Sequence, residues 1–385
     1  MCLRLLTSTI LFSLPLAGTS NDAFISNVFQ LTFEGNRSGE GYFSPSGKKI
    51  CFQSEAFPGN PFYQIYQLNL ENGDNSLVSS GIGKTTCAWF HPSEKLVLYA
   101  STHHDSSSLQ KQKDELQDRI NGNKKKYSWD YDESYELYTR DLETGQEKRL
   151  TDSLGYDAEC AFSPDGSKIV FTSNRHMYEG KTLKYDNISA YNDLYLMDYE
   201  SGNVERLTDH FGYDGGPFFD YSGDRICWRR FTPDGHNAEI FVMSLKTREE
   251  KKVTQLEAMS WAPFFHPSGE YVIFSTNLHG FQNFELYIVD ADSKKQPVRI
   301  TDRNGFDSLP SFSPDGNTIS WTSNATPTKK SQIFIGDWNH ENAMAALLNS
   351  PERDKKKHTE KTNSKNSEPS KSESRNHVNY LSSDE

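Results

Sequence analysis

Four histidines stand in segments where imidazole side chains from different parts of the chain could meet. His103 and His104 are followed by Asp105, and His176 and His279 come from later, separate segments. Imidazole nitrogens and carboxylate oxygens are ligands that zinc and similar divalent metals bind. A metal held there would support a lyase or hydrolase acting on a polar carbohydrate or peptide. However, the sequence contains no H-E-x-x-H helix, no G-x-S-x-G elbow and no phosphate-binding glycine loop.

Charged and aromatic residues at loop positions suggest a different chemistry, the recognition of a peptide or a small polar ligand. Aromatic anchors with convergent charges are what such a site needs. We predict no catalytic residue, no cofactor and no metal for it, and the histidines remain the metal alternative. The residues that we predict to bind a ligand are Arg37, Glu40, Glu159, Arg175, Asp214, Arg229, Arg230, Trp261, Asp307 and Asn324.

Many of these residues also have a purely structural interpretation. Gly-Tyr-Asp occurs at 155–157 and 212–214, and Gly-Phe-Asp at 305–307, so these residues could simply hold turns between repeats. Three of the arginines could be solvated or paired with neighbouring carboxylates rather than with a ligand, namely Arg175, Arg229 and Arg230. Both interpretations stay open on the sequence alone.

The elements that position these loops follow from a turn motif that occurs six times. Its fullest copy is Phe162-Ser-Pro-Asp-Gly166, followed by an apolar run that ends at Asn174. Proline presets its own φ, and glycine accepts the positive φ that a tight turn between strands requires. The copies begin at Phe43, Phe90, Phe162, Phe219, Phe265 and Phe312. Their spacings of 47, 72, 57, 46 and 47 residues are typical of propeller blades.

We therefore predict an all-β fold, a six-bladed β-propeller of four-stranded blades spanning residues 21–338. No fourth strand follows Trp338, whereas Gln30-Leu31-Thr32 precedes the first inner strand without a blade of its own. This N-terminal strand is predicted to complete the last blade. Ring closure of this kind removes the exposed sheet edges that promote aggregation.

Insertions explain the longer spacings and indicate a binding face. They cover 102–136, with a predicted helix at Gln110–Ile120 and a solvated tip at Lys124–Lys126, and also 176–192 and 229–237. All three lie between the second and third strands of a blade, so they emerge on one face. Long insertions on one face of a repeat protein are often where it binds. We predict the site at the mouth of the central channel on this face.

The repeats resemble the TolB-type propeller repeat, F-S-P-D-G-x-x-I-x-F-x-S-N. Phe162–Asn174 and Phe312–Asn324 match it nearly throughout, and the other four copies match with substitutions. The resemblance covers Asn27 to Trp338 and implies the fold more specifically than a function. TolB carries an α/β domain before its propeller, and no segment of that size precedes Asn27, so we do not expect a Tol–Pal role. Oligogalacturonate lyases, which use a metal held by histidine, are similar in architecture only.

Composition and the two ends of the chain complete the prediction. The net charge of −12 over 385 residues disfavours a nucleic-acid partner. Residues 1–20 are typical of a secretory signal peptide, and their apolar run is too short to span a bilayer. After the propeller we predict a short helix at 339–349 and a disordered charged tail at 350–385. Buried free thiols are expected at Cys51, Cys87, Cys160 and Cys227.

The sequence thus predicts an exported protein, periplasmic or secreted, that is monomeric and does not span the membrane. It would bind a protein, a peptide or a cell-envelope component at the channel mouth without catalysis. The alternative is a metal-assisted lyase or hydrolase at the same mouth. In a third interpretation the propeller is a structural scaffold that its tail tethers to an assembly.

Overall fold

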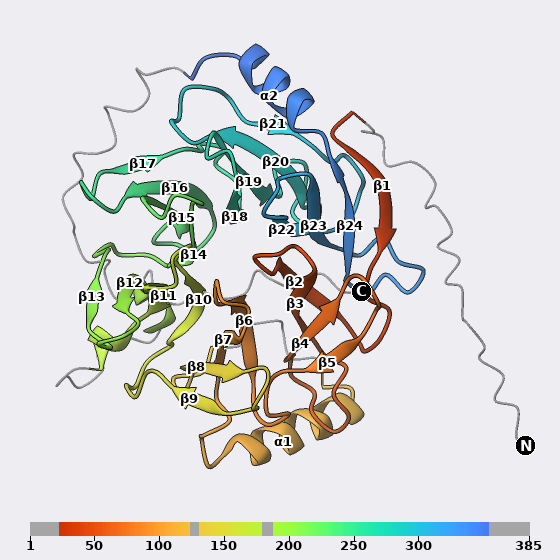
Figure 1. Cartoon of the computed structure of the whole chain (residues 1–385), viewed down its shortest axis with the longest axis vertical. Helices are drawn as coiled ribbons and strands as arrows, with labels where there is room; N and C mark the ends of the chain where they lie inside the picture. The colour runs from red at the N-terminus through yellow and green to blue at the C-terminus, as the bar shows by residue number, and fades with distance from the viewer. Residues whose placement is uncertain (1–22, 124–130, 179–187, 354–385) are drawn as a thin grey trace, which may run out of the picture.

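The computed structural model describes residues 23–123, 131–178 and 188–353. Within these ranges the strands form six four-stranded antiparallel sheets arranged around one axis (Figure 1). The predicted signal peptide at 1–20, the Lys124–Lys126 run and the predicted tail from 354 onward lie outside the described residues.

Each blade runs from an inner strand at the axis to an outer strand at the rim. The first three blades are β2 (Ser38–Phe43), β3 (Lys49–Ser54), β4 (Gln64–Asn69) and β5 (Asn75–Leu77); β6 (Thr85–Phe90), β7 (Leu96–Ser101), β8 (Glu136–Asp141) and β9 (Glu147–Arg149); and β10 (Ala158–Phe162), β11 (Lys168–Ser173), β12 (Asp193–Asp198) and β13 (Val204–Arg206). The last three are β14 (Asp214–Phe219), β15 (Arg225–Phe231), β16 (Ala238–Ser244) and β17 (Glu250–Lys252); β18 (Ser260–Phe265), β19 (Tyr271–Thr276), β20 (Glu285–Asp290) and β21 (Val298–Arg299); and β22 (Asp307–Phe312), β23 (Thr318–Ser323), β24 (Gln332–Trp338) and β1 (Ile25–Gln30). This confirms the predicted six-bladed all-β propeller.

The N-terminal strand closes the ring, as predicted. β1 pairs with β24 from Ile25, opposite Trp338, to Gln30, opposite Phe334. β1 overlaps the predicted strand Gln30–Thr32 only at Gln30. Beyond its end, the Leu31 amide still donates to the Ile333 carbonyl (2.7 Å). Phe24 stacks on Trp338, so apolar packing reinforces the pairing.

The two faces of the ring differ in what they carry. The Pro-Gly turns join inner to second strands on one face, which we call the turn face. The loops into the inner strands and those between second and third strands share the other, which we call the insertion face. α1 (Ser108–Ile120) belongs to the blade-two insertion and begins two residues before the predicted helix. Short 3₁₀ turns at Arg175–Met177 and Ile188–Tyr191 belong to blade three.

The chain after the last strand packs against the ring. α2 (His340–Asn349) buries Ala343 and Leu347 in the core cluster that contains Ile25 and Trp338. Residues 350–353 differ from the disorder expected for them, because Glu352 pairs with Lys295 and Arg353 is buried. The Arg353 guanidinium donates to the carbonyls of Lys252 and Val253 at 3.0 and 2.6 Å. In the three described ranges, no helix is long and apolar enough to cross a membrane.

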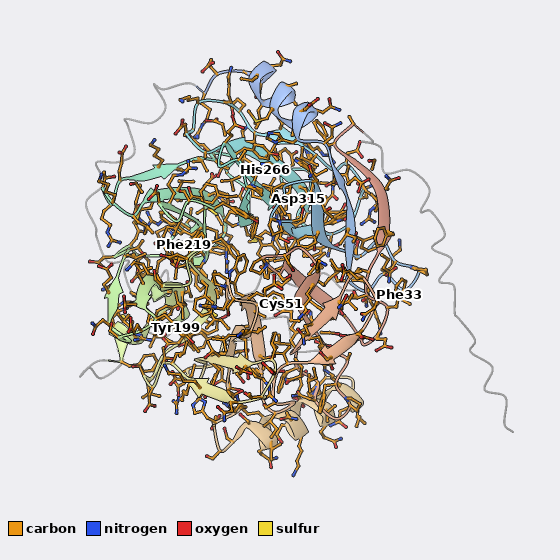
Figure 2. The ribbon with its side chains drawn as sticks, in the orientation of Figure 1. Phe33, Cys51, Tyr199, Phe219, His266 and Asp315 are labelled. Atoms are coloured by element: carbon orange, nitrogen blue, oxygen red, sulfur yellow. The ribbon has the colours of Figure 1, made fainter. Side chains whose placement is uncertain are left out.

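The predicted free thiols are present inside the blades. Cys51, Cys160 and Cys227 are buried, whereas Cys87 keeps some solvent exposure. Side-chain sticks show Cys51 toward the middle of the ring and Phe33 at its periphery beside β1 (Figure 2). Of the four, Cys87 alone occupies the special inner-strand position described next.

Candidate functional site

Every inner strand carries a bulge at the same position, and the bulged residue has a positive φ. The register shifts there in each pairing of inner with second strand. Left-handed backbone costs a non-glycine residue on the order of 1 kcal/mol, so its recurrence reflects a requirement of the fold. These residues form what we call the axial ring: Glu40 (φ 53°), Cys87 (52°), Glu159 (52°), Gly216 (62°), Ala262 (49°) and Leu309 (53°).

Half of the axial ring carries polar side chains, and the other half has apolar side chains or glycine. Blades one to three supply Glu40, Cys87 and Glu159. Gly216 has no side chain, which leaves room for Arg229, because a Cβ added at Gly216 would collide with Arg229 Nη1. At Gly215 an added Cβ would collide with the Tyr213 ring and the Glu159 carboxylate. The absence of side chains at Gly215 and Gly216 therefore makes room for the Arg229 guanidinium and the Tyr213 phenol beside Glu159.

Glu159 is the acceptor around which these groups assemble. It accepts from the Tyr213 hydroxyl (2.7 Å), the Gly216 amide (2.6 Å) and Arg229 Nη2 (2.8 Å). Little solvent reaches the pair, because the Arg229 and Glu159 side chains are 14% and 9% exposed. The guanidinium also lies 5.0 Å from the Tyr213 ring centroid. Arg229 is thus committed to Glu159. We call Glu40, Cys87, Glu159, Tyr213 and Arg229 the axial cluster.

Glu40 is the second carboxyl group of this cluster and has a different environment. Its Oε2 is enclosed and accepts no hydrogen bond from any residue in the described ranges. Burial raises the pKa of Glu40 to about 7; the Cys87 thiol and Arg229 oppose this shift, and Glu159 adds to it. One carboxylate is therefore fully hydrogen-bonded, and the other titrates near neutral pH.

Below the axial cluster, toward the turn face, four aromatic rings close the axis. Tyr42 and Phe218, from opposite blades one and four, have centroids 5.1 Å apart. Trp89 and Phe264, from opposite blades two and five, are 5.9 Å apart. We call these four residues the aromatic floor. Contact between opposite blades means that a ligand approaching the axial cluster must come from the insertion face.

Most of the other predicted residues form ion pairs around the rim of the insertion face. Arg37 pairs with Glu55 (2.9 Å), and Arg175 pairs with Asp157. Arg230 donates two bonds of 2.7 Å to Asp214 and pairs with Glu250. Asp307 accepts from Arg303 (3.0 Å) and from Ser323 (2.5 Å). The structure therefore gives these residues structural partners and does not bring them to Glu40.

Asn324 and Trp261 also have local contacts. The Asn324 side-chain oxygen accepts from the Phe306 amide at 3.0 Å, and Asn174 does the same for Tyr156 at 2.8 Å. Such repetition is typical of a turn that the repeat needs. Trp261 packs against Phe284, with ring centroids 5.0 Å apart. Its buried Nε1 has no hydrogen-bond partner among the described residues.

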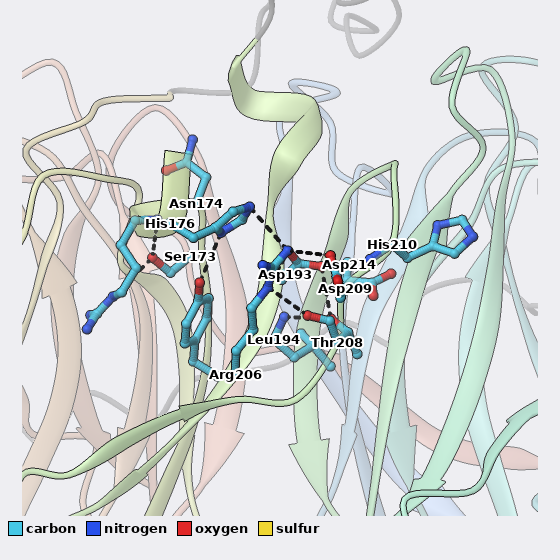
Figure 3. Close-up of polar contacts among 12 residues, drawn as sticks. Ser173, Asn174, His176, Asp193, Leu194, Arg206, Thr208, Asp209, His210 and Asp214 are labelled. Atoms are coloured by element: carbon cyan, nitrogen blue, oxygen red, sulfur yellow. Dashed lines mark hydrogen bonds and ion pairs between the residues drawn. The ribbon is translucent and has the colours of Figure 1, made fainter. Parts of the chain in front are cut away.

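The four histidines are not brought together. Each contacts side chains of its own blade. In blade three, His176 bonds the Tyr195 hydroxyl (2.9 Å) and contacts Arg206 (3.2 Å), and Figure 3 shows the second contact. In blade two, His104 bonds Tyr138 and His103 pairs with Glu147 at 2.9 Å each. In blade five, His279 bonds Tyr287 (2.5 Å). Among the described residues, no group of three or more His, Cys, Asp or Glu side chains could hold a metal ion.

The residues predicted to bind a ligand include Glu40, Glu159 and Arg229 but not Cys87, Tyr213 or any residue of the aromatic floor. A usable signal exists in the turn motif. The axial ring lies three residues before each leading phenylalanine, and the floor lies one residue before it. Counting back from the motif therefore identifies both layers without a structure.

The insertion face also exposes large apolar side chains in its loops. Phe33 and Leu154, in loops that lead to inner strands, are 64% and 61% exposed. Ile82, Leu278 and Phe281 lie in loops of the same face and are also exposed. The turn-face loops expose Tyr221. These side chains come from loops of several blades, on the same face as the axial cluster, so this face offers apolar contacts to a partner.

Replacing Glu40 by glutamine is expected to change how stability depends on pH. The folded-state pKa of about 7 exceeds the ordinary value of 4.5, so the folded protein holds this proton more tightly than the unfolded chain. The contribution of Glu40 to stability is therefore complete below pH 4.5 and is lost as the pH rises through 7. Between pH 5 and 8, the variant should gain stability relative to wild type by on the order of 3 kcal/mol.

Urea denaturation at several pH values measures this difference. Glu94→Gln is the matched control, because Glu94 also has a positive φ (57°) but lies in a turn-face loop. A Glu40→Gln curve that runs parallel to the wild-type curve would contradict the enclosed environment assigned to Glu40.

Comparisons with known proteins agree with the propeller fold. The family model of the TolB beta propeller domain matches residues 217–364. The Tol-Pal system protein TolB of Wolinella succinogenes is 27% identical over 191 residues, which cover 48% of this chain and 40% of that protein. The chain thus spans about two fifths of the length of the curated relatives it matches.

Solved structures show the same fold. The TolB structure from Acinetobacter baumannii has a TM-score of 0.52 at 21% identity and covers 72% of this chain and 57% of that one. The tricorn protease structure has a TM-score of 0.50 at 16% identity, with 78% and 26% covered. At these identities the similarity concerns the fold alone.

Proposed function

Because this chain is a TolB-like six-bladed β-propeller, we propose that it acts as an exported, non-catalytic binding module. Its partner would be a protein or peptide segment of a cell-envelope component, which docks on the insertion face and reaches the axial cluster. The relatives named Tol-Pal system proteins support a role in binding, although the match covers only part of their length. We further propose a periplasmic location and a monomeric state.

One observation carries this proposal. Exposed apolar side chains surround the insertion face, while a charged cluster lies on the axis of the same face above a closed floor. Apolar anchors give a docked partner its affinity, and buried polar groups give it orientation. The histidines lie on three different blades, so no observation favours the metal-assisted alternative.

Charged substitutions on the insertion face should abolish partner binding. Phe33→Glu and Leu154→Glu each place a carboxylate on the proposed interface and should weaken binding at least tenfold. The measurement is affinity capture of cross-linked partners by the tagged full chain from its native host, followed by titration of the identified partner.

The matched controls introduce the same charge on exposed apolar residues away from the insertion face. Tyr221→Glu lies in a turn-face loop, and Leu348→Glu lies on α2, which follows the turn-face end of β24. Both should bind as wild type does. Equal loss of binding in all four variants, or in none, would refute the assignment of the insertion face.

A further inference from the structure

We propose that the Glu40 carboxyl group receives a primary ammonium group of the bound partner, so that the axial cluster selects segments presenting an amine. The proposal rests on the proposed function, because it names the chemistry that the insertion-face site recognises. The amine would be either the amino terminus of the partner or a lysine side chain. Both sources offer the same group, and the experiment below separates them.

The backbone of the axial ring is held in place at Glu40 by hydrogen bonds and close packing. The Glu40 amide donates to Thr322 Oγ1 (3.2 Å), and the next carbonyl, that of Gly41, accepts from Ser311 Oγ (2.7 Å). At Gly41 an added Cβ would lie 2.9 Å from both Ile50 and Ser320, so the strand is closely packed here. The backbone of Glu40 has a φ of 53°, and its carboxyl group interacts with Cys87, Glu159 and Arg229 of the axial cluster. Rigid placement of a charged group is what a selective site requires.

The charges around Glu40 also favour a cationic ligand. Arg229, the cation whose charge lowers the pKa of Glu40, already donates to Glu159 at 2.8 Å. Glu40 Oε2 has no hydrogen-bond partner among the described residues, and the Cys87 thiol, a weak donor, provides the side-chain hydrogen bond that lowers the pKa of this carboxyl group. An ionised carboxylate in such an enclosed position is strongly stabilised by a cationic hydrogen-bond donor. The described residues offer no group of three metal ligands, which favours a cation that brings its own N–H donors over a metal ion.

The aromatic floor beside Glu40 offers aromatic rings to a bound amine. Tyr42 lies two residues beyond Glu40 on β2, and the negative charge of Glu40 helps to raise the pKa of Tyr42, after the larger effect of burial. Tyr42 and Trp89 have ring centroids 5.3 Å apart and form the part of the floor contributed by blades one and two. Ring faces attract ammonium groups, and the attraction grows when the cation is desolvated. A carboxylate above aromatic rings is therefore a favourable environment for an amine.

Binding of an ammonium group should also displace a proton. The titratable and charged groups that interact with Glu40 are Tyr42, Cys51, Cys87, Glu159, Cys160 and Arg229. Only ionised Glu40 pairs with a cation, so affinity should rise between pH 6 and 8 and proton release should accompany binding. Lysine amines stay protonated throughout this range, and amino termini, whose pKa is about 7.7–8.0, stay largely protonated up to about pH 7, so the change up to about pH 7 reports on Glu40 for both sources.

The test uses small probes with and without the amine. The first pair is triglycine and N-acetyl-triglycine, and the second is N-acetyl-lysine amide and N-acetyl-norleucine amide. Calorimetric titration of the full chain at about pH 7, where both amines are largely protonated, should show at least fivefold tighter binding for the amine of one pair, and that pair identifies the source. Glu40→Gln should remove this preference, and Glu94→Gln should keep it.

Proton release, measured in buffers of different ionisation enthalpy, gives a second readout that needs no variant. Equal binding of both members of each pair, or an amine preference that survives in Glu40→Gln, would overturn the proposal. If the preference is absent while Phe33→Glu and Leu154→Glu still abolish partner binding, the amine assignment fails and the proposed function stands. If those rim variants bind normally, the proposed function fails first.

Discussion

Replacing Arg229 by methionine is expected to lower the free energy of unfolding by about 3–5 kcal/mol. The substitution keeps an unbranched side chain of similar length but removes the charge that Glu159 faces. Both side chains are largely shielded from water, at 14% and 9% exposure, so solvent cannot replace the lost partner. Urea denaturation monitored by tryptophan fluorescence measures the change.

Two further variants make this prediction specific. Glu159→Gln in the Arg229→Met background removes the uncompensated charge, while the amide oxygen can still accept from the Gly216 amide and the amide nitrogen can donate to the Tyr213 hydroxyl oxygen. It should therefore restore a large part of the lost stability. Arg248→Met breaks an exposed pair with Glu205 and should cost no more than about 1 kcal/mol. Equal losses for Arg229→Met and Arg248→Met would contradict the buried axial cluster.

Replacing Gly336 by valine is expected to open the ring. At Gly336 an added Cβ would lie 2.8 Å from Ile25 Cγ2 and 3.0 Å from the Ser26 carbonyl oxygen. The carbonyl belongs to the backbone of β1 and cannot move without disturbing the pairing that closes blade six. We expect a loss of at least about 3 kcal/mol, at the upper end for overpacking, because the displaced strand also loses its apolar contacts.

Hydrogen exchange identifies the cause of this loss. The amides of Ile25–Gln30 should exchange faster in Gly336→Val, and the exposed edge of β24 should promote self-association. Ser76→Val, on the exposed outer strand β5 of blade one, is the control and should change stability by less than about 0.5 kcal/mol. Unchanged exchange of β1 in Gly336→Val would show that closure does not depend on this contact.

The architecture could be predicted because it depends on local and repeated signals. The Pro-Gly turn after Phe162 specifies a turn from its own residues, and its recurrence specifies the number of blades. Closure by the N-terminal segment followed from a strand count that left one blade incomplete at Trp338. The boundary of that strand was less certain, because Leu31 and Thr32 look as strand-like in the sequence as Ile25 does.

The axial cluster could be predicted only in part, because it depends on contacts across the ring. Glu159 and Arg229 are 70 residues apart, and nothing local to either indicates that they pair. Gly215 and Gly216 look like an ordinary flexible turn in the sequence, whereas the structure uses them to admit Tyr213 and Arg229. The four histidines are the opposite case. Their similar positions in the loops of different blades suggested that they could meet, but each one contacts side chains of its own blade.

Site-specific photo-crosslinking in the native host tests the central claim, docking on the insertion face, most directly. A photoreactive phenylalanine analogue would replace Leu154 on the insertion face or Tyr221 on the turn face, two residues that are both exposed at the surface. If the partner docks on the insertion face, we expect a discrete crosslinked partner from position 154 and none from position 221. The same adduct from both positions, or an adduct from position 221 alone, would contradict docking on this face.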